Sequence, residues 1–420
     1  MKPLPGPFRP GFFRSPLRGP WLTSVLGLVL LLSVPVMFLT GMLSYTAYNP
    51  RIGGNDITPD AGWLRLVFFN WPTHPYWLYR FTQGVHVTLG VVLVPVILAK
   101  LWSVIPRLFE FPPIRSVAHG LERISLLLLV GGAVFEFVTG ILNTQYWYPF
   151  PTSFYTAHLY GAWIFMSAFV MHAALKFPTM RAALKSRSIK QELRTPVSQT
   201  VVEPFLEGGL VSPDPEKATL SRRGALGLVA SGSALMLITA VGQSTGGSLR
   251  RLAFLAPRGQ SLGDGPNDFQ INQTAADVGV RASDTGDVWV LEVPGPTPLR
   301  LTRSELMAMD LHTSHLPIAC VEGWSTGTQR WTGVRLRDLA TMAGVSQPHT
   351  VFVESLQRGG FGSTTLAANQ IDHPDSLLAL QVNGVDLSLD HGYPARIIVP
   401  ANPGVHNTKW VRKLTFAPGH

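Results

Sequence analysis

Five long apolar stretches constrain what this chain can fold into more than any other feature. They cover residues 21–45, 81–105, 121–144, 157–177 and 224–242. Each can supply the ~20 residues that an α-helix needs to cross a hydrocarbon core about 30 Å thick. The first stretch is too long, and too poorly matched to a small-residue cleavage site, to be a removed signal peptide. The sequence therefore predicts a multi-pass membrane protein.

The composition agrees with a membrane segment and excludes several other classes of protein. Charged residues make up 14% of the chain and the mean hydropathy is +0.20, whereas a soluble domain has about 25% charged residues. A disordered chain is excluded, because disorder needs low hydrophobicity and high net charge. The single cysteine, Cys320, excludes an internal disulfide framework, a cysteine-rich zinc site and a cysteine-ligated iron–sulfur cluster.

The basic residues predict how the chain is oriented. Residues 1–20 contain four Lys or Arg and no acid, and residues 178–223 contain eight, whereas segments 46–79 and 145–156 contain only Arg51 and Arg65. Cytoplasmic loops carry the excess of Lys and Arg. We therefore expect a cytoplasmic N-terminus in the inner (cytoplasmic) membrane and everything after about residue 245 outside the cytoplasm. The formal charge of +9 then reflects topology, and no nucleic-acid partner is expected.

The C-terminal part has the pattern of a separate, strand-rich domain. Asn383-Gly384 between two apolar runs is a strong hairpin signal. Two helices are expected, at 304–309 and 335–343. The expected strands cover residues 288–293, 316–321, 350–354, 377–382, 395–399 and 410–416.

The membrane half contains an internal repeat with matched histidines. The first apolar stretch ends FLTGMLSY and the third ends FVTGILNT, and each is followed by a short loop with aromatics and proline. His86 lies near the start of the second stretch, and His158 occupies the matching place in the fourth. Two repeated helix–loop–helix units predict a four-helix bundle.

The spacing of the histidines points to haem. His158 and His172 are 14 residues apart, so they share one helix face and differ in depth by about 21 Å. Ionisable side chains within membrane spans are costly and usually functional. A lone histidine in such a span is more often a hydrogen-bonded core residue. Histidines matched across repeated helices favour ligation of haem iron, with His86 level with His158.

This half resembles the di-haem cytochrome b subunits of formate dehydrogenases and nickel–iron hydrogenases, over about residues 15–178. The resemblance implies that His158 and His172 each bind one b-type haem, and that His86 is the second ligand of the outer haem. The family's inner partner lies at the start of the first helix, where this chain reads RSPLRGPWL without histidine. His119 is a candidate substitute, so one or two haems remain open.

Two separated motifs mark the C-terminal domain. The first begins at Cys320 as Cys-Val-Glu-x-Trp-Ser and continues into a Trp-x-Gly-x-x-Leu stretch at 331–336. The second is His-Gly-x-Pro-x-Arg at 391–396, followed by Lys409-Trp410. Together they resemble the molybdopterin domain of the sulfite oxidase family, nearest its bacterial branch of periplasmic methionine sulfoxide reductase catalytic subunits, over about residues 263–420.

The resemblance implies a role for each candidate residue. The thiolate of Cys320 would bind molybdenum, for which a soft sulfur ligand is suited. Arg and Lys side chains would hold the phosphate of the pterin cofactor. For Cys320 the alternative is a small buried hydrophobe, and for the others it is a solvated surface group. The expected cofactor-binding residues are Asn267, His391, Arg396, Lys409 and, as a weaker candidate, His406.

Two departures bear on substrate and export. No arginine follows Cys320 in residues 321–325, whereas sulfite oxidases hold their anion with arginines there, so sulfite is disfavoured unless Arg330 or Arg358 folds inward. Arg222-Arg223 directly precede the fifth apolar stretch and resemble a twin-arginine export signal. An ordinary positively charged flank is the alternative reading.

The expected fold is an all-α transmembrane four-helix haem bundle plus a fifth anchoring helix, followed by an α+β strand-rich molybdopterin-binding domain. The expected segments are a cytoplasmic N-terminus (1–20), the cytochrome b domain (21–178), a cytoplasmic loop (179–222), the fifth helix (223–245), a linker (246–262) and the molybdopterin domain (263–420).

The expected function is that of a molybdopterin-dependent oxidoreductase. It would pass electrons from membrane quinol through haem b to oxygen-atom transfer at molybdenum, reducing a small or protein-bound S-oxide or N-oxide. The alternatives are oxidation of a small donor such as sulfite with electrons passed to quinone, or a non-catalytic electron-transfer or sensory membrane protein. The twin-arginine machinery is an expected partner.

Overall fold

The computed structural model describes residues 6–9, 11–48, 69–111, 114–205, 209–256, 258, 263–358 and 361–418. Two compact units divide the chain. One comprises Met1–Phe38 and Thr88–Leu237, and is called here the helical unit. The other comprises Leu39–Val87 and Ile238–His420, and is called here the mixed unit.

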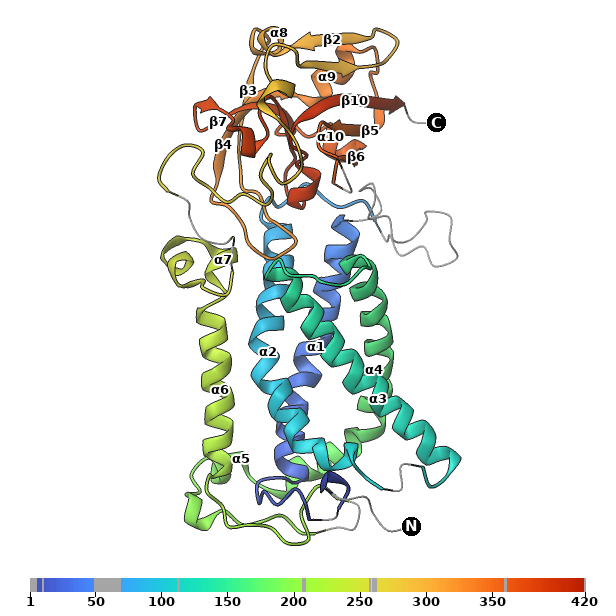
Figure 1. Cartoon of the computed structure of the whole chain (residues 1–420), viewed down its shortest axis with the longest axis vertical. Coiled ribbons are helices and arrows are strands. Elements are labelled where there is room, and N and C mark those ends of the chain that lie inside the picture. Colours follow the sequence, from blue (N-terminus) through green and yellow to red (C-terminus); the bar gives the residue numbers. More distant parts are fainter. Residues whose placement is uncertain are drawn as a thin grey trace. The chain divides into compact units, whose positions relative to one another are not determined.

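Five helices in the described part of the chain are long and apolar enough to cross a membrane, which confirms the predicted apolar helices. Their apolar side chains suit lipid, and an α-helix satisfies its backbone hydrogen bonds internally. The helices α1 and α2 each have residues in both units. The five are α1 (Pro20–Tyr48), α2 (Leu78–Leu108), α3 (Val117–Thr144), α4 (Phe154–Ser186) and α6 (Arg222–Ile238) (Figure 1).

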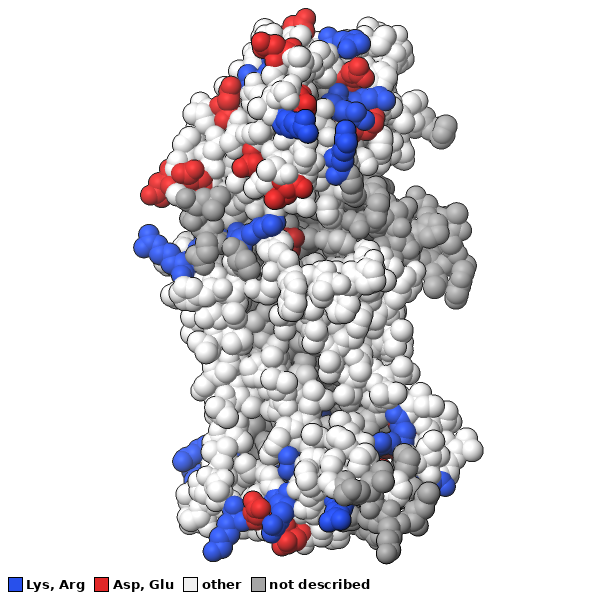
Figure 2. Space-filling view, in the orientation of Figure 1, with Lys and Arg blue, Asp and Glu red and all other residues white. Residues whose placement is uncertain are grey.

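The surface of the helical unit is apolar where a bilayer would contact it. Leu32, Leu127, Leu175 and Leu228 are each 66–71% exposed, and contiguous exposed apolar surface marks membrane or protein contact. On the face drawn in Figure 2, the middle of the helical region shows no charged side chains. Inside, Trp21 packs in one cluster with residues of α1, α2 and α6, among them Leu22, Leu26, Leu93, Val96 and Val229.

The mixed unit contains two five-stranded sheets. One has the order β2-β1-β10-β5-β6, in which β1 and β10 are parallel; the other has the order β3-β4-β7-β8, with β9 also paired to β7. The strands are β1 (Val290–Val293), β2 (Leu299–Thr302), β3 (His312–Leu316), β4 (Gln329–Arg335), β5 (Pro348–Ser355), β6 (Ser363–Ala367), β7 (Leu377–Val382), β8 (Val385–Asp386), β9 (Arg396–Ile398) and β10 (Val411–Pro418).

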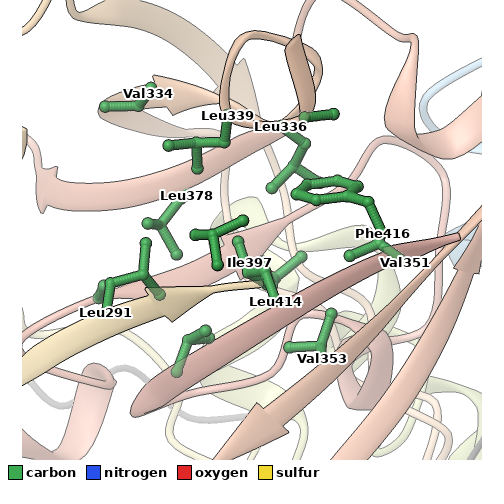
Figure 3. Packing of buried hydrophobic residues seen from close by; sticks show 14 of the residues in the cluster. Leu291, Val334, Leu336, Leu339, Val351, Val353, Leu378, Ile397, Leu414 and Phe416 are labelled. Carbon is green, nitrogen blue, oxygen red and sulfur yellow. The ribbon is translucent and has the colours of Figure 1, made fainter. Parts of the chain in front are cut away.

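Short helices and one apolar core complete this unit. The helices are α7 (Gly242–Thr245), α8 (Arg303–Met307), α9 (Leu336–Met342) and α10 (Ala368–Ile371). Figure 3 shows side chains from both sheets and from α9 meeting in one core, including Leu291, Leu336, Leu378 and Leu414. These four are fully buried, so the core fixes the loops that connect the strands.

Most expected elements of the mixed unit are present, and one is wrong. The hairpin is confirmed, because Asn383 and Gly384 have φ of 53° and 88° between the paired Val382 and Val385, as a two-residue type I′ turn requires. The strand expected at 316–321 is wrong. Strand β3 ends at Leu316, and Pro317 has no N–H with which to continue the ladder. The apolar residues 318–321 are instead a buried irregular segment.

Candidate functional site

Cys320 lies in this irregular segment between β3 and β4. Its side chain is buried, its N–H donates to Trp324 O at 2.8 Å, and its carbonyl accepts from Gly323 N at 3.1 Å. Gly323 has φ of +90°, a conformation that favours glycine. Burial, followed by the nearby Glu322 carboxyl, raises the pKa of the Cys320 thiol well above its usual value. A thiolate here therefore needs a cationic partner such as a metal ion.

Arg396 is a fully buried cation beside this region. Its two terminal nitrogens donate to His391 O and Asn407 O, each at 3.0 Å. The guanidinium lies over the ring of Trp331, 5.2 Å from its centroid. Burial lowers the pKa of Arg396 to about 9. Its Nε is buried without a hydrogen-bond partner in the described part of the chain.

Lys409 is buried near enough to Arg396 for their charges to interact. Its Nζ donates to Gln273 O and, at 3.0 Å, to Asp390 O. Burial, with the charge of Arg396 as the second cause, lowers the pKa of Lys409 to about 7. Asp390 and Cys320 act in the opposite direction, so Cys320 lies within electrostatic reach of Lys409.

His391 completes the pocket as a neutral ring. It stacks on Phe269, with centroids 3.7 Å apart and planes at 17°, and its Nε2 donates to Asn267 O at 2.8 Å. Burial, reinforced by Arg396, lowers the pKa of His391 to about 3. The next residue, Gly392, is needed for close packing, because a Cβ there would lie 2.9 Å from Lys409 Cβ.

The described hydrogen bonds of Arg396 and Lys409 give these cations neutral partners. The side-chain donors of Arg396 and Lys409 have carbonyl oxygens, not carboxylates, as their hydrogen-bond acceptors in the described residues. A buried charge is costly unless it is paired, and a phosphate would supply strong, charge-assisted hydrogen bonds. The orphaned Nε of Arg396 is therefore consistent with a bound anionic cofactor.

The remaining two candidates, Asn267 and His406, form hydrogen bonds with residues distant in the sequence. Asn267 accepts from Ser388 N at 2.9 Å and donates to Asp386 O at 3.1 Å, which fixes the loop next to His391. His406 is buried, but Nδ1 accepts from the Thr364 hydroxyl at 2.7 Å and Nε2 donates to Ala47 O at 3.0 Å. Both ring nitrogens of His406 thus contact protein.

The comparison with known proteins decides the family. Residues 278–419 match the family described as "Oxidoreductase molybdopterin binding domain". The uncharacterized oxidoreductase YuiH of Bacillus subtilis (strain 168) is 32% identical over 142 residues, which cover 31% of this chain and 71% of that protein. The chain belongs to this molybdopterin-binding oxidoreductase family. The expectations of an enzyme and of a molybdopterin cofactor are thereby confirmed.

Other members of the family are matched over a smaller share of their length. Mitochondrial sulfite oxidase of Rattus norvegicus is 30% identical over 158 residues, which cover 31% of this chain and 29% of that enzyme. The NADH nitrate reductase of Volvox carteri is 33% identical over 148 residues, which cover 28% and 17%. The chain thus spans less than a third of these two relatives.

The pocket cations give a first testable expectation. Arg396→Gln keeps a hydrogen-bonding side chain but removes the charge. Charge-assisted hydrogen bonds contribute about 1.5–3 kcal/mol, so cofactor retention should weaken roughly 10–100-fold. Molybdenum per chain, measured by elemental analysis of the purified protein, should fall accordingly. The exposed Arg337 of α9 provides the control Arg337→Gln, and an unchanged molybdenum content in Arg396→Gln would contradict the assignment.

In the mixed unit, His86 of α2 is held by the repeated Thr-Gly pair of α1. His86 Nδ1 lies 3.4 Å from Thr40 Oγ1. A Cβ on Gly41 would lie 3.0 Å from His86 Cε1, so the glycine is what allows the ring to lie so close to α1.

In the helical unit, His158 of α4 has the same arrangement with α3. His158 Nδ1 lies 3.1 Å from Thr139 Oγ1, and a Cβ on Gly140 would lie 3.6 Å from His158 Cε1. Glu136 also contacts this ring: its Oε2 lies 3.2 Å from His158 Nδ1. The sequence analysis missed Glu136, although a carboxylate within the apolar run FEFVTG was a readable signal.

The other two histidines are placed separately. His172 lies on α4. It shares a helix face with His158 and lies about 21 Å further along the helix axis by helix rise. His119 lies in the first turn of α3, where its N–H donates to Ser116 Oγ and its Nδ1 accepts from Arg115 N at 3.2 Å. The described contacts of His119 are therefore with the start of its own helix, and not with His172.

Proposed function

We propose that this enzyme is membrane-bound and passes electrons from quinol, through b-type haem, to oxygen-atom transfer at the molybdenum cofactor. The observation that carries the proposal is the repeated Thr–His arrangement. The same Phe-x-Thr-Gly motif orients an imidazole on the neighbouring helix in both repeats. A hydrogen bond at Nδ1 sets the ring orientation and directs Nε2 toward a metal.

The residues present fit the two cofactors in different ways. Thr40 and Thr139 would orient His86 and His158, and Gly41 leaves room beside the ring of His86. When bound, haem would supply a one-electron carrier and the molybdenum cofactor a two-electron centre for oxygen transfer. Cys320 would ligate the metal. Arg396 and Lys409 would hold the phosphate while their burial excludes water.

A neutral S-oxide or N-oxide suits the site better than an anion. Both arginines that could replace the missing anion-binding residues, Arg330 and Arg358, are exposed. Residues 321–325 contain no cation. A sulfite dianion would find no arginine in the segment that follows Cys320, whereas a neutral oxide needs no counter-charge. Reduction of a small or protein-bound oxide is therefore the favoured direction.

The test uses the purified holoenzyme with a reduced quinol analogue. Dimethyl sulfoxide or trimethylamine N-oxide should reoxidise the quinol, with one molybdenum and one or two haems per chain. Sulfite with oxidised quinone should give no turnover. The reverse pattern would support the second candidate, oxidation of a small donor, which the similarity to sulfite oxidase favours. A preparation without haem would contradict the electron route.

We further propose that Arg222-Arg223 act as a twin-arginine signal that exports the molybdopterin domain after it has folded in the cytoplasm. The structure gives the two arginines different surroundings. Arg222 is buried and forms ion pairs with Glu192 at 3.4 Å and Glu203 at 3.9 Å, whereas Arg223 is exposed. Arg222 thus also stabilises the helical unit, while Arg223 has no such role in its described contacts.

Replacing both arginines by lysine should keep the domain in the cytoplasm. Arg222→Lys with Arg223→Lys preserves the positive charge but removes the guanidinium pair. In spheroplasts, the C-terminal domain should become protected from added protease. Arg194→Lys, at an exposed residue of the expected cytoplasmic loop, is the control. In this variant the C-terminal domain should remain accessible to the protease. Normal accessibility of the double variant would show that the pair is only a charged flank.

A further inference from the structure

We propose that residues 321–325, which directly follow Cys320, are held against the N-terminal end of α2 and form the electron path between Cys320 and His86. This inference rests on the proposed function, because it requires haem at His86. All the residues involved belong to the mixed unit. The segment 321–325 is called here the docking segment.

The first contacts join the docking segment to α2. Gln83 is buried, and its Nε2 donates to the carbonyl oxygen of Val321. Gly323 packs against Val87 so closely that a Cβ on the glycine would lie 2.7 Å from Val87 Cβ. Gln83, His86 and Val87 are spaced i, i+3 and i+4, which places them on one face of the helix. The face that contacts the docking segment is therefore the face that carries His86.

A second set of contacts holds the docking segment from the side of α7. Ser244 Oγ donates to Gly323 O. Ser325 donates through its N–H to Gln243 O at 2.9 Å and through its hydroxyl to Ser244 O at 2.8 Å. The side chain of Arg250 donates to Ser325 O. With Val321 and Gly323 bound as well, the backbone of the segment is fixed at both ends and in the middle.

The two sets of contacts are themselves joined. Arg80 of α2 donates to Ser244 O at 2.6 Å and to Thr245 O. Helix α2 therefore binds both the docking segment and the α7 residues that hold it. The arrangement is a packed, hydrogen-bonded network, the kind of physical connection through which coupling between sites is carried.

The amide of Gln83 provides a side-chain hydrogen bond between α2 and Val321. From Cys320 the path crosses one peptide bond to Val321 O, one hydrogen bond to Gln83 and less than one helical turn to His86. Bonds and hydrogen bonds carry electrons more efficiently than gaps do. The Oε1 atom of Gln83 is buried without a hydrogen-bond partner among the described residues, so a leucine there would cost less desolvation. The hydrogen bond that the amide makes to Val321 fits a role in the path.

The test separates electron delivery from oxygen transfer. Holoenzyme whose haem has been reduced is mixed with dimethyl sulfoxide in a stopped-flow spectrometer, and haem reoxidation is followed. In Gln83→Leu the rate should fall roughly tenfold, because a through-space gap replaces the hydrogen bond that joins Val321 to α2 in the connected path. With reduced benzyl viologen, which delivers electrons to molybdenum directly, kcat and KM for dimethyl sulfoxide should remain at wild-type values. The Mo(V) electron paramagnetic resonance spectrum should also be unchanged.

Thr82→Val is the matched control. Thr82 is buried on the same helix turn, but its hydroxyl donates only to Leu78 O and Tyr79 O of α2. The haem reoxidation rate of Thr82→Val should equal that of the wild type. A wild-type rate in Gln83→Leu overturns the inference alone, and so does a parallel fall in the viologen-driven reaction. If dimethyl sulfoxide does not reoxidise the haem of the wild-type protein, the proposed function is wrong, and the inference is wrong with it.

Discussion

Cys320→Ser is expected to abolish oxygen-atom transfer to background while leaving the haem absorption spectrum unchanged. A serine oxygen is a harder ligand than a thiolate and is far less suited to molybdenum in this cofactor. The change is confined to one buried side chain in the mixed unit. Activity with dimethyl sulfoxide and reduced benzyl viologen measures the loss, and the haem spectrum reports on the rest of the protein.

The chain offers a clean background for this experiment, because Cys320 is its single cysteine. Molybdenum content should be measured alongside activity, since the phosphate contacts of Arg396 and Lys409 are untouched by the change. We expect part of the cofactor to remain bound in an inactive form. Near wild-type turnover in Cys320→Ser would show that another group ligates the metal.

The second large effect concerns haem. If the proposed ligand scheme holds, His86→Ala and His158→Ala should each remove the same haem, because each would take away one of its two proposed ligands. If His119 and His172 hold a second haem, the wild type contains two per chain and His119→Ala removes one. If they do not, the wild type contains one and His119→Ala leaves the spectrum unchanged. Pyridine haemochrome assays of purified protein measure these ratios.

The exposed His315 of β3 provides the control variant His315→Ala, which should retain all haem. Two haems per chain are slightly favoured by the 14-residue spacing of His158 and His172. Complete loss of haem in His172→Ala, together with full retention in His158→Ala, would refute the ligand scheme.

The sequence predicted the features that depend on local pattern. Apolar runs are sufficient to predict α1 to α4 and α6, because each helix satisfies its own backbone. The Asn383-Gly384 turn was predictable because few residues accept two successive positive φ angles. The strand expected at 316–321 failed for a local reason as well. Residues 318–321 are apolar because they are buried, which resembles the pattern of a strand, but Pro317 interrupts the hydrogen-bond ladder.

The parts that sequence could not supply depend on distant contacts. His391 stacks on Phe269, more than 120 residues away in the chain, and nothing in either motif predicts the pair. His406 resembles a cofactor ligand in sequence, yet its nitrogens contact Thr364 and Ala47. Strands β2 and β4 were missed because the exposed Arg300 and Arg330, together with half-buried Thr and Gln side chains, interrupt their apolar pattern.

The position of β10 has a consequence for biosynthesis. It is the last strand of the mixed unit to emerge from the ribosome, yet it lies at the centre of its sheet between β1 and β5. Until residues 411–418 have been synthesised, the sheet is therefore incomplete: the pair β1–β2 and the pair β5–β6 lack the strand that joins them. Helices α1 to α4, in contrast, satisfy their own backbones as soon as they are made. The sheet that contains β10 can therefore be completed only after residues 411–418 have left the ribosome, when these helices can already have formed.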